Sequence, residues 1–172
     1  PEFTVTPYKL NYRIGDSIFF SWNLPLNTLN VSNNDSLQLS NNLQIFGSIG
    51  IGEFLRTPPM QRNAINDFEI IPKSQRFSFS NANLSPDSKR IYFQAELNGF
   101  NYRFEFILIP KKTGVMCIGL SNNNFYLNEN CIAFHRTEFV SGPSNSYLRD
   151  SITNSVLWSD ANNSGFYFIV KE

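Results

Sequence analysis

Three features are scarce in this sequence: long apolar runs, net charge and histidine. No run of 18 apolar residues occurs and no signal-peptide pattern opens the chain, so we expect neither a transmembrane helix nor a signal peptide within it. The 14 basic and 14 acidic residues give a net charge of zero, which provides no overall field to attract nucleic acid or an anionic membrane. We therefore expect no nucleic-acid partner, and membrane contact only through a lipid anchor outside this sequence.

Sequence motifs for phosphate, nucleophilic and metal chemistry are also lacking. No GxGxxG or GxxxxGK[ST] run exists to cradle a phosphate. His135 is the only histidine and no GxSxG nucleophile accompanies it, so we interpret it as a structural or surface residue. No CxxC or HxxxH spacing indicates a metal site. We expect no cofactor, no metal and no catalysis; a pair of carboxylates acting as in a glycosidase is the enzymatic alternative.

Aromatic residues and asparagine are abundant instead. The chain has 17 Phe and 7 Tyr, which favour strands, and its asparagines gather between the apolar runs, where they can close turns. A length of 172 residues fits one domain, so we expect a single all-β domain over residues 1–172. Pro1-Glu2-Phe3 resembles the remnant of a fusion-vector cloning site, after removal of a native N-terminus.

The strongest local pattern is a long hairpin over residues 90–110. Two alternating runs flank Asn98-Gly99, a pair preferred in type I′ turns because both central residues need positive φ. Closure at that pair sets Leu97 opposite Phe100 and places the large apolar side chains on one face. The predicted pairs continue with Ala95–Tyr102, Phe93–Phe104 and Ile91–Phe106.

Other short strands complete the predicted sheet pattern. We expect them at residues 17–22, 43–49, 76–80, 114–120 and 166–170. In the first of these, Ile18, Phe20 and Trp22 alternate inward, and the last is apolar on both faces, as in a central strand. Together with the hairpin they predict an antiparallel β-sandwich of about seven to nine strands, Ig-like in general layout.

Three segments depart from the strand pattern. Residues 25–40 and 50–67 are predicted to be long loops or insertions, and the glycines in "GSIGIGEF" (47–54) indicate a strand that ends in a bulge and a turn. Residues 144–157 show helical spacing of apolar side chains and indicate one short helix.

Both cysteines flank an asparagine-rich stretch. Cys117 lies in a predicted strand and Cys131 follows a polar loop. A disulfide would close this loop and stabilise the fold by about 3 kcal/mol on the chain-entropy model; two buried thiols, or a metal site with His135, are the alternatives. The disulfide is our main hypothesis, and it predicts an oxidising compartment.

The polar loop between the cysteines is the predicted binding surface. Phe125 and Tyr126 lie at its centre beside Asn123 and Asn124, and aromatic rings beside amides suit contact with a protein or a glycan. By contrast, Trp22 and Trp158 are expected in the core.

Two sequence stretches carry a family resemblance. "YRIGDSIFFSW" and "FNYRFEFILIPKKTGVMCIGLS" resemble the Ig-like β-sandwich modules of uncharacterised Bacteroidetes-type cell-envelope lipoproteins. The resemblance implies an extracellular, periplasmic or outer-membrane surface location, and transfers no functional residue. The expected role is a non-catalytic module that binds a protein or a glycan or serves as structure; a glycan-active enzyme or carbohydrate-binding accessory domain, and a subunit of a larger envelope assembly, are the alternatives.

Overall fold

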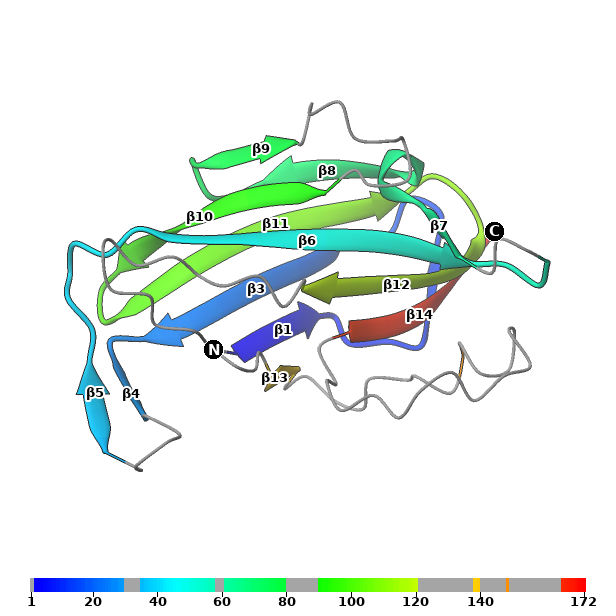
Figure 1. Cartoon of the computed structure of the whole chain (residues 1–172). Helices are drawn as coiled ribbons and strands as arrows, with labels where there is room; N and C mark the ends of the chain where they lie inside the picture. The colour runs from blue at the N-terminus through cyan, green and yellow to red at the C-terminus, as the bar shows by residue number, and fades with distance from the viewer. Residues whose placement is uncertain are drawn as a thin grey trace.

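Two β-sheets pack face to face in the computed structural model (Figure 1), which describes residues 2–29, 35–57, 61–79, 90–120, 138–139, 148 and 165–172. The first sheet has the strand order β13 (Glu138–Phe139), β1 (Glu2–Thr6), β3 (Ile18–Pro25), β11 (Asn101–Pro110), β8 (Phe68–Pro72). The second has the order β10 (Ile91–Asn98), β6 (Ile45–Phe54), β12 (Gly114–Leu120), β14 (Gly165–Lys171), β2 (Asn11–Arg13).

Shorter elements complete these sheets. They are β9 (Phe77–Phe79) beside β10, β7 (Gln61–Asn63) beside β6, an arm of β4 (Asn27–Leu29) with β5 (Ser36–Gln38), and the 3-10 turn η1 (Ile65–Asp67). The predicted all-β sandwich is confirmed, but the described residues form 14 strands rather than seven to nine. Two pairs, β1 with β13 and β14 with β2, are parallel, so the sandwich is not wholly antiparallel.

The β10–β11 hairpin joins the two sheets. Its strands pair with each other only from Glu96–Arg103 to Asn98–Asn101. Beyond that ladder β10 pairs with β6 in one sheet, and β11 pairs with β3 and β8 in the other. The hairpin is therefore confirmed as an element, but its strands separate to form the two layers of the sandwich.

The predicted hairpin register is wrong by two residues. Leu97 lies opposite Tyr102, so the central turn residues are Gly99 and Phe100 instead of Asn98 and Gly99. Gly99 has φ 63°, the positive value that a primed turn requires at its first central position. The register of β11 is set by its long ladder with β3, which begins at the Asn101–Pro25 pair. Because the shift is even, the predicted inward face is otherwise preserved.

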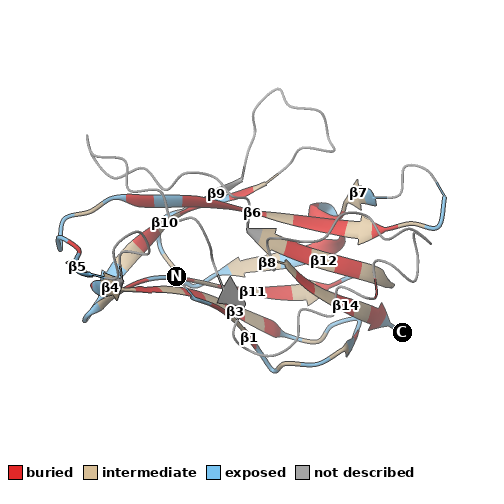
Figure 2. Cartoon of the chain, turned by 60° about the horizontal axis from the view of Figure 1, so that its bottom comes forward, coloured by how far each residue is buried: buried red, intermediate tan, exposed pale blue. Residues whose placement is uncertain are grey.

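Aromatic side chains fill the space between the sheets. Phe93 of β10 stacks on Phe104 of β11 with ring centroids 4.0 Å apart, and Trp22 of β3 lies beside Phe93 at 5.9 Å. Along β3 and β14, buried residues alternate with partly exposed ones (Figure 2). The predicted inward positions Ile18, Phe20 and Trp22 are all fully buried. β14 lies between β12 and β2, which confirms its central position.

Two segments predicted as loops contain strands. The range 25–40 holds the β4–β5 arm, and 50–67 holds the end of β6, β7 and η1. β6 continues through Gly50 and Gly52 without the predicted turn, because β12 pairs with it along this length and the Gln61 side chain covers Gly52. Glycine lowers strand propensity, but pairing with β12 at Gly50, and with both β12 and β7 at Gly52, overrides it.

Phe3, near the start of the sequence, and the segment predicted as a helix differ in how far the structure describes them. Phe3, assigned above to a cloning remnant, is 1% exposed and stacks on Phe20 at 5.5 Å, so it is a core residue whatever its origin. Of the helix predicted at 144–157 the structure describes Leu148 alone, which is buried; the rest of that segment, His135 and Trp158 lie outside the described residues.

Candidate binding surface

The predicted binding residues are not placed by this structure. Asn123, Asn124, Phe125 and Tyr126 lie outside the described residues, as does Cys131. Cys117 lies on β12, partly exposed, in register with Gly52 of β6 and Tyr167 of β14. The Cys117–Cys131 disulfide therefore stays a prediction.

A different candidate lies at the end of the sandwich where β10 turns into β11. Three segments meet there (Figure 1): the hairpin turn 98–101, the junction of β3 with the β4–β5 arm, and the loop 39–44 that leads into β6. We call these three segments the loop end. Loops from both sheets converge there.

Leu26 connects the three segments through its backbone. Its N–H donates to the Phe100 carbonyl oxygen at 2.8 Å, and its own carbonyl accepts from the Leu39 N–H at 2.7 Å. The Leu26 side chain is 8% exposed, so burial holds these backbone groups in place. The turn and the loop are thus fixed relative to β3.

Tyr102 makes a second connection. Its hydroxyl donates to the Ser40 carbonyl oxygen at 2.8 Å and accepts from the Leu43 N–H at 2.9 Å. The ring is 1% exposed. Burial raises the pKa of Tyr102, partly offset by the hydrogen bond from Leu43. The hydroxyl therefore remains a protonated donor at neutral pH, and it orders the loop 39–44 on β11.

Phe100 projects from this braced support into solvent. It is 84% exposed, compared with 38–45% for the other exposed large apolar residues in the described part of the chain. Leu97, on the neighbouring strand end, is 38% exposed. A phenylalanine at a tight-turn position does nothing for the core, and exposing it costs apolar hydration. Its backbone is nevertheless held by Leu26, so the ring is presented as an apolar anchor from a fixed backbone position.

The three segments of the loop end contain no charged side chain, and the oppositely charged Glu96 and Arg103 flank the hairpin turn as a pair. In the sequence from residue 17 to residue 52 the only charged side chain is Asp35. The exposed polar groups are amides and hydroxyls: Asn27, Ser40, Asn41, Asn42, Gln44 and Asn98. Sequence reasoning missed this region because it assigned residues 25–40 to an irregular loop. The long run from residue 17 to residue 52, with one charged residue, is the sequence signal that could have found it.

The opposite end of the sandwich carries an ion network. Arg62 binds both the Glu53 and the Asp67 carboxylates, and Lys112 Nζ lies 2.7 Å from Asp67 Oδ1. Asp67 is 3% exposed. Burial opposes its ionisation, but hydrogen bonds from Lys112 and Arg62 outweigh this and hold the pKa of Asp67 below 3.8. The carboxylate is thus kept charged and paired.

This network does not resemble a glycosidase pair. A retaining or inverting enzyme needs one carboxylic acid that stays protonated to serve as general acid. The pKa of Asp67 is lowered, which favours the ionised carboxylate, and Glu53 pairs with the same Arg62 guanidinium. Lys111 N–H also donates to the Asp67 carbonyl at 2.8 Å, so the network ties the turn after β11 to η1. Its evident role is structural.

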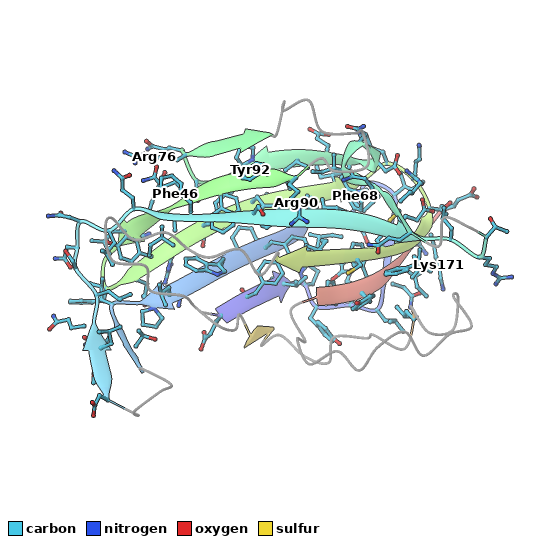
Figure 3. The ribbon with its side chains drawn as sticks, viewed as in Figure 1. Phe46, Phe68, Arg76, Arg90, Tyr92 and Lys171 are labelled. Carbon is cyan, nitrogen blue, oxygen red and sulfur yellow. The ribbon has the colours of Figure 1, made fainter. Side chains whose placement is uncertain are left out.

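A smaller aromatic pair lies on the outer face of the second sheet. Phe46 is 44% and Tyr92 39% exposed, and they occupy diagonal positions on the paired strands β6 and β10. Figure 3 shows their labelled side chains on the same side of the molecule as Arg76 and Arg90. Half-buried aromatics on a sheet face are ordinary, so the loop end with Phe100 is the stronger candidate.

The described residues also bear on metal binding and membrane spanning. They contain no group of three or more His, Cys, Asp or Glu side chains positioned to hold a metal ion. In the same part of the chain, no helix has the length and apolarity needed to cross a membrane.

Comparison with known proteins gives one distant structural similarity. No family model matches the sequence, and no curated protein matches it. The structure is similar to a solved cohesin module from a Clostridium perfringens ATCC13124 family 33 glycoside hydrolase. The two share 11% identity with a TM-score of 0.35, over 74% of this chain and 84% of that one. This similarity is too distant to indicate what the present chain binds.

Proposed function

We propose that this chain is a non-catalytic β-sandwich module that binds a partner through its loop end. The observation that carries the proposal is Phe100, which is 84% exposed at the tip of a turn whose backbone is fixed by Leu26. An exposed aromatic on a fixed backbone is suited to binding, because its apolar surface is desolvated on contact and the backbone that carries it loses little conformational entropy.

We also propose a secreted or cell-envelope location for this module. The resemblance of its sequence stretches to envelope modules supports the location, as does the predicted Cys117–Cys131 disulfide. A non-catalytic role is supported by the ion network, where Glu53 and Asp67 are both paired with Arg62. A structural subunit of a larger envelope assembly would use the same exposed surface against a fixed neighbour.

The test compares wild-type protein with two alanine variants. Immobilised wild type, Phe100→Ala and Ile14→Ala are exposed to a glycan array and to a lysate and culture medium of the source cells. Ile14 is the matched control because it is 45% exposed and lies in the turn hydrogen-bonded to Pro110, at the far end of β11. We expect wild type and Ile14→Ala to capture the same ligand.

Phe100→Ala should capture that ligand at least about tenfold more weakly, as for a buried aromatic anchor. Equal capture by all three proteins would show that the ligand binds elsewhere and would overturn the proposal. Capture of nothing by the wild type would favour a structural subunit.

A further inference from the structure

We infer that the ligand of the loop end is an uncharged glycan, an inference that depends on the binding role proposed above. Three properties of the loop end lead to it: its aromatic anchor, its polar groups and its lack of charge. The first two match the chemistry of a sugar, and the third argues against charged partners.

The anchor offers the surface that a sugar ring needs. The faces of a pyranose carry C–H groups, and these pack on the face of an aromatic ring. Phe100 is 84% exposed and its carbonyl is held by the Leu26 N–H at 2.8 Å. The ring therefore projects from a fixed backbone position.

The polar side chains of the loop end can hydrogen-bond with the hydroxyl groups at the edge of a sugar ring. Exposed amides and a hydroxyl occur at Asn27, Ser40, Asn41, Asn42, Gln44 and Asn98. Amides and hydroxyls both donate and accept, as sugar hydroxyls do. The loop 39–44 that carries four of these groups is ordered by the two hydrogen bonds of Tyr102. Ordering before binding lowers the entropy that the complex must lose.

The charge pattern argues against acidic ligands and membranes. From residue 17 to residue 52 Asp35 is the only charged side chain. Acidic polysaccharides, nucleic acids and anionic lipid surfaces are attracted by clustered Lys and Arg. The three segments of the loop end contain neither, and Arg103, which lies two residues beyond the turn, is paired with Glu96 on β10. A neutral ligand suits the surface because it requires no charged partner.

A protein partner suits the surface less well. A stable protein interface buries roughly 800 Å² on each side around a largely apolar centre. Among the described residues, Phe100 is the large apolar side chain exposed within the loop end, and Leu97 and Phe46 lie just outside it at 38% and 44% exposure. A single ring surrounded by amides fits a narrow glycan better than a broad protein surface.

The experiment is affinity electrophoresis of the full chain in gels that contain one polysaccharide each. The neutral set is mixed-linkage β-glucan, galactomannan and xylan, and the acidic set is polygalacturonate and alginate. We expect retardation by at least one neutral polysaccharide and by neither acidic one. Retardation should be unchanged between about 50 mM and about 500 mM salt. Salt over that range screens exposed charges, so binding that uses no charged groups should not respond to it.

Three variants identify the surface responsible. Phe100→Ala should lose at least about tenfold in affinity, and Phe100→Trp should retain binding because its aromatic face is larger. Phe100→Leu keeps the apolar character without the ring and should lose binding as well. The substitutions lie at an 84% exposed position, so all three proteins should stay folded, and circular dichroism checks this.

The outcomes separate this inference from the proposed function. No retardation by any neutral polysaccharide, together with Phe100-dependent capture of a protein, would overturn the glycan inference and leave the binding role intact. Retardation by an acidic polysaccharide that weakens with salt would also overturn it. Retardation that is equal in wild type and Phe100→Ala would contradict both the inference and the proposed position of the binding surface.

Discussion

Tyr102 shows how one side chain can serve both the core and the surface. Its ring is 1% exposed, while its hydroxyl bonds to Ser40 and Leu43 in the loop that leads into β6. Burying a hydroxyl is unfavourable unless it is hydrogen-bonded. The loop backbone supplies both bonds, so the loop takes its conformation from a residue almost 60 positions away in the sequence.

Tyr102→Phe should loosen this loop while preserving the core. We expect the free energy of unfolding to fall by about 1–2 kcal/mol, because one donor and one acceptor of the loop lose their partner. Urea unfolding measures the loss, and amide exchange should become faster at Leu43. Tyr92→Phe, at a 39% exposed position, is the control and should change stability by less than about 0.5 kcal/mol. Unchanged exchange at Leu43 would show that the hydroxyl does not order the loop.

Asp67 links stability to pH at the opposite end of the molecule. Its folded pKa is held below 3.8 by Lys112 and Arg62 in spite of burial. A depressed folded pKa stabilises the protein above the unfolded pKa, and the contribution disappears as the pH falls below 3.8 through the folded value. Stability from this residue is thus complete at neutral pH and lost only in acid.

Asp67→Asn should remove this contribution. We expect a loss of about 1–2 kcal/mol near pH 6, at the lower end for a buried ion pair because Arg62 and Lys112 are partly in solvent. As the pH falls through the folded pKa in acid, the difference between variant and wild type should shrink, because the wild-type carboxylate then takes up a proton too. Denaturant unfolding near pH 6 and at an acid pH measures this, with Glu69→Gln on the adjacent strand as control. A difference that is the same at both pH values would argue against the ion network.

At the scale of elements, the β10–β11 hairpin determines both the sandwich and the binding surface. Its ladder is short, and the strands then separate into different sheets. The turn is consequently placed at one end of the sandwich, beside the β4–β5 arm (Figure 1). A hairpin that stayed paired along its length would not bring the turn with Phe100 to the β4–β5 arm and the loop 39–44.

Gly99→Ala tests the conformation of the turn. Gly99 has φ 63° and no described atom within 4 Å of the position that a Cβ would take. The cost is therefore one of backbone conformation, and we expect about 1–2 kcal/mol from denaturant unfolding. Gly50→Ala is the matched control, since Gly50 also has open space but lies in a strand without positive φ. Equal effects of the two substitutions would rule out the positive-φ turn.

At the scale of the whole molecule, one aromatic core joins two ends of the sandwich that differ in charge. Cross-sheet contacts such as Phe93 with Phe104 and Phe68 with Phe168 hold the layers together. The chain has equal numbers of acidic and basic residues, but they are not evenly distributed. The ion network lies at one end of β11 and the loop end at the other, which gives the two ends different chemistry.

The compartment of the whole molecule can be tested through its two thiols. If Cys117 and Cys131 form a disulfide, a maleimide reagent should label neither in denatured, unreduced protein and both after reduction. Intact-mass measurement counts the labels. The Cys117→Ser variant should accept one label without reduction, which confirms that the reagent reaches residue 131. Two labels on unreduced wild type would contradict the disulfide and remove one support for a secreted location.

The sequence by itself determined several of the main strands and which of their faces is buried. Ile18, Phe20 and Trp22 alternate as predicted, and the inward residues of the hairpin from Ile91 to Phe106 are buried except at its tip. These are local properties, because a strand repeats every two residues whatever its partners. The same rule kept the predicted faces correct when the hairpin register was wrong, since the shift was an even number of residues.

Only the tertiary structure decided which strands pair and which loops meet. β3 fixed the register of β11, β12 carried β6 through its glycines, and Leu26 with Tyr102 assembled the loop end. These contacts join residues distant in sequence, and their energies depend on packing and hydrogen bonds that no local pattern contains. The exposure of Phe100 has the same origin, because an alternating strand pattern cannot show that a turn will move by one residue and leave a phenylalanine at its tip.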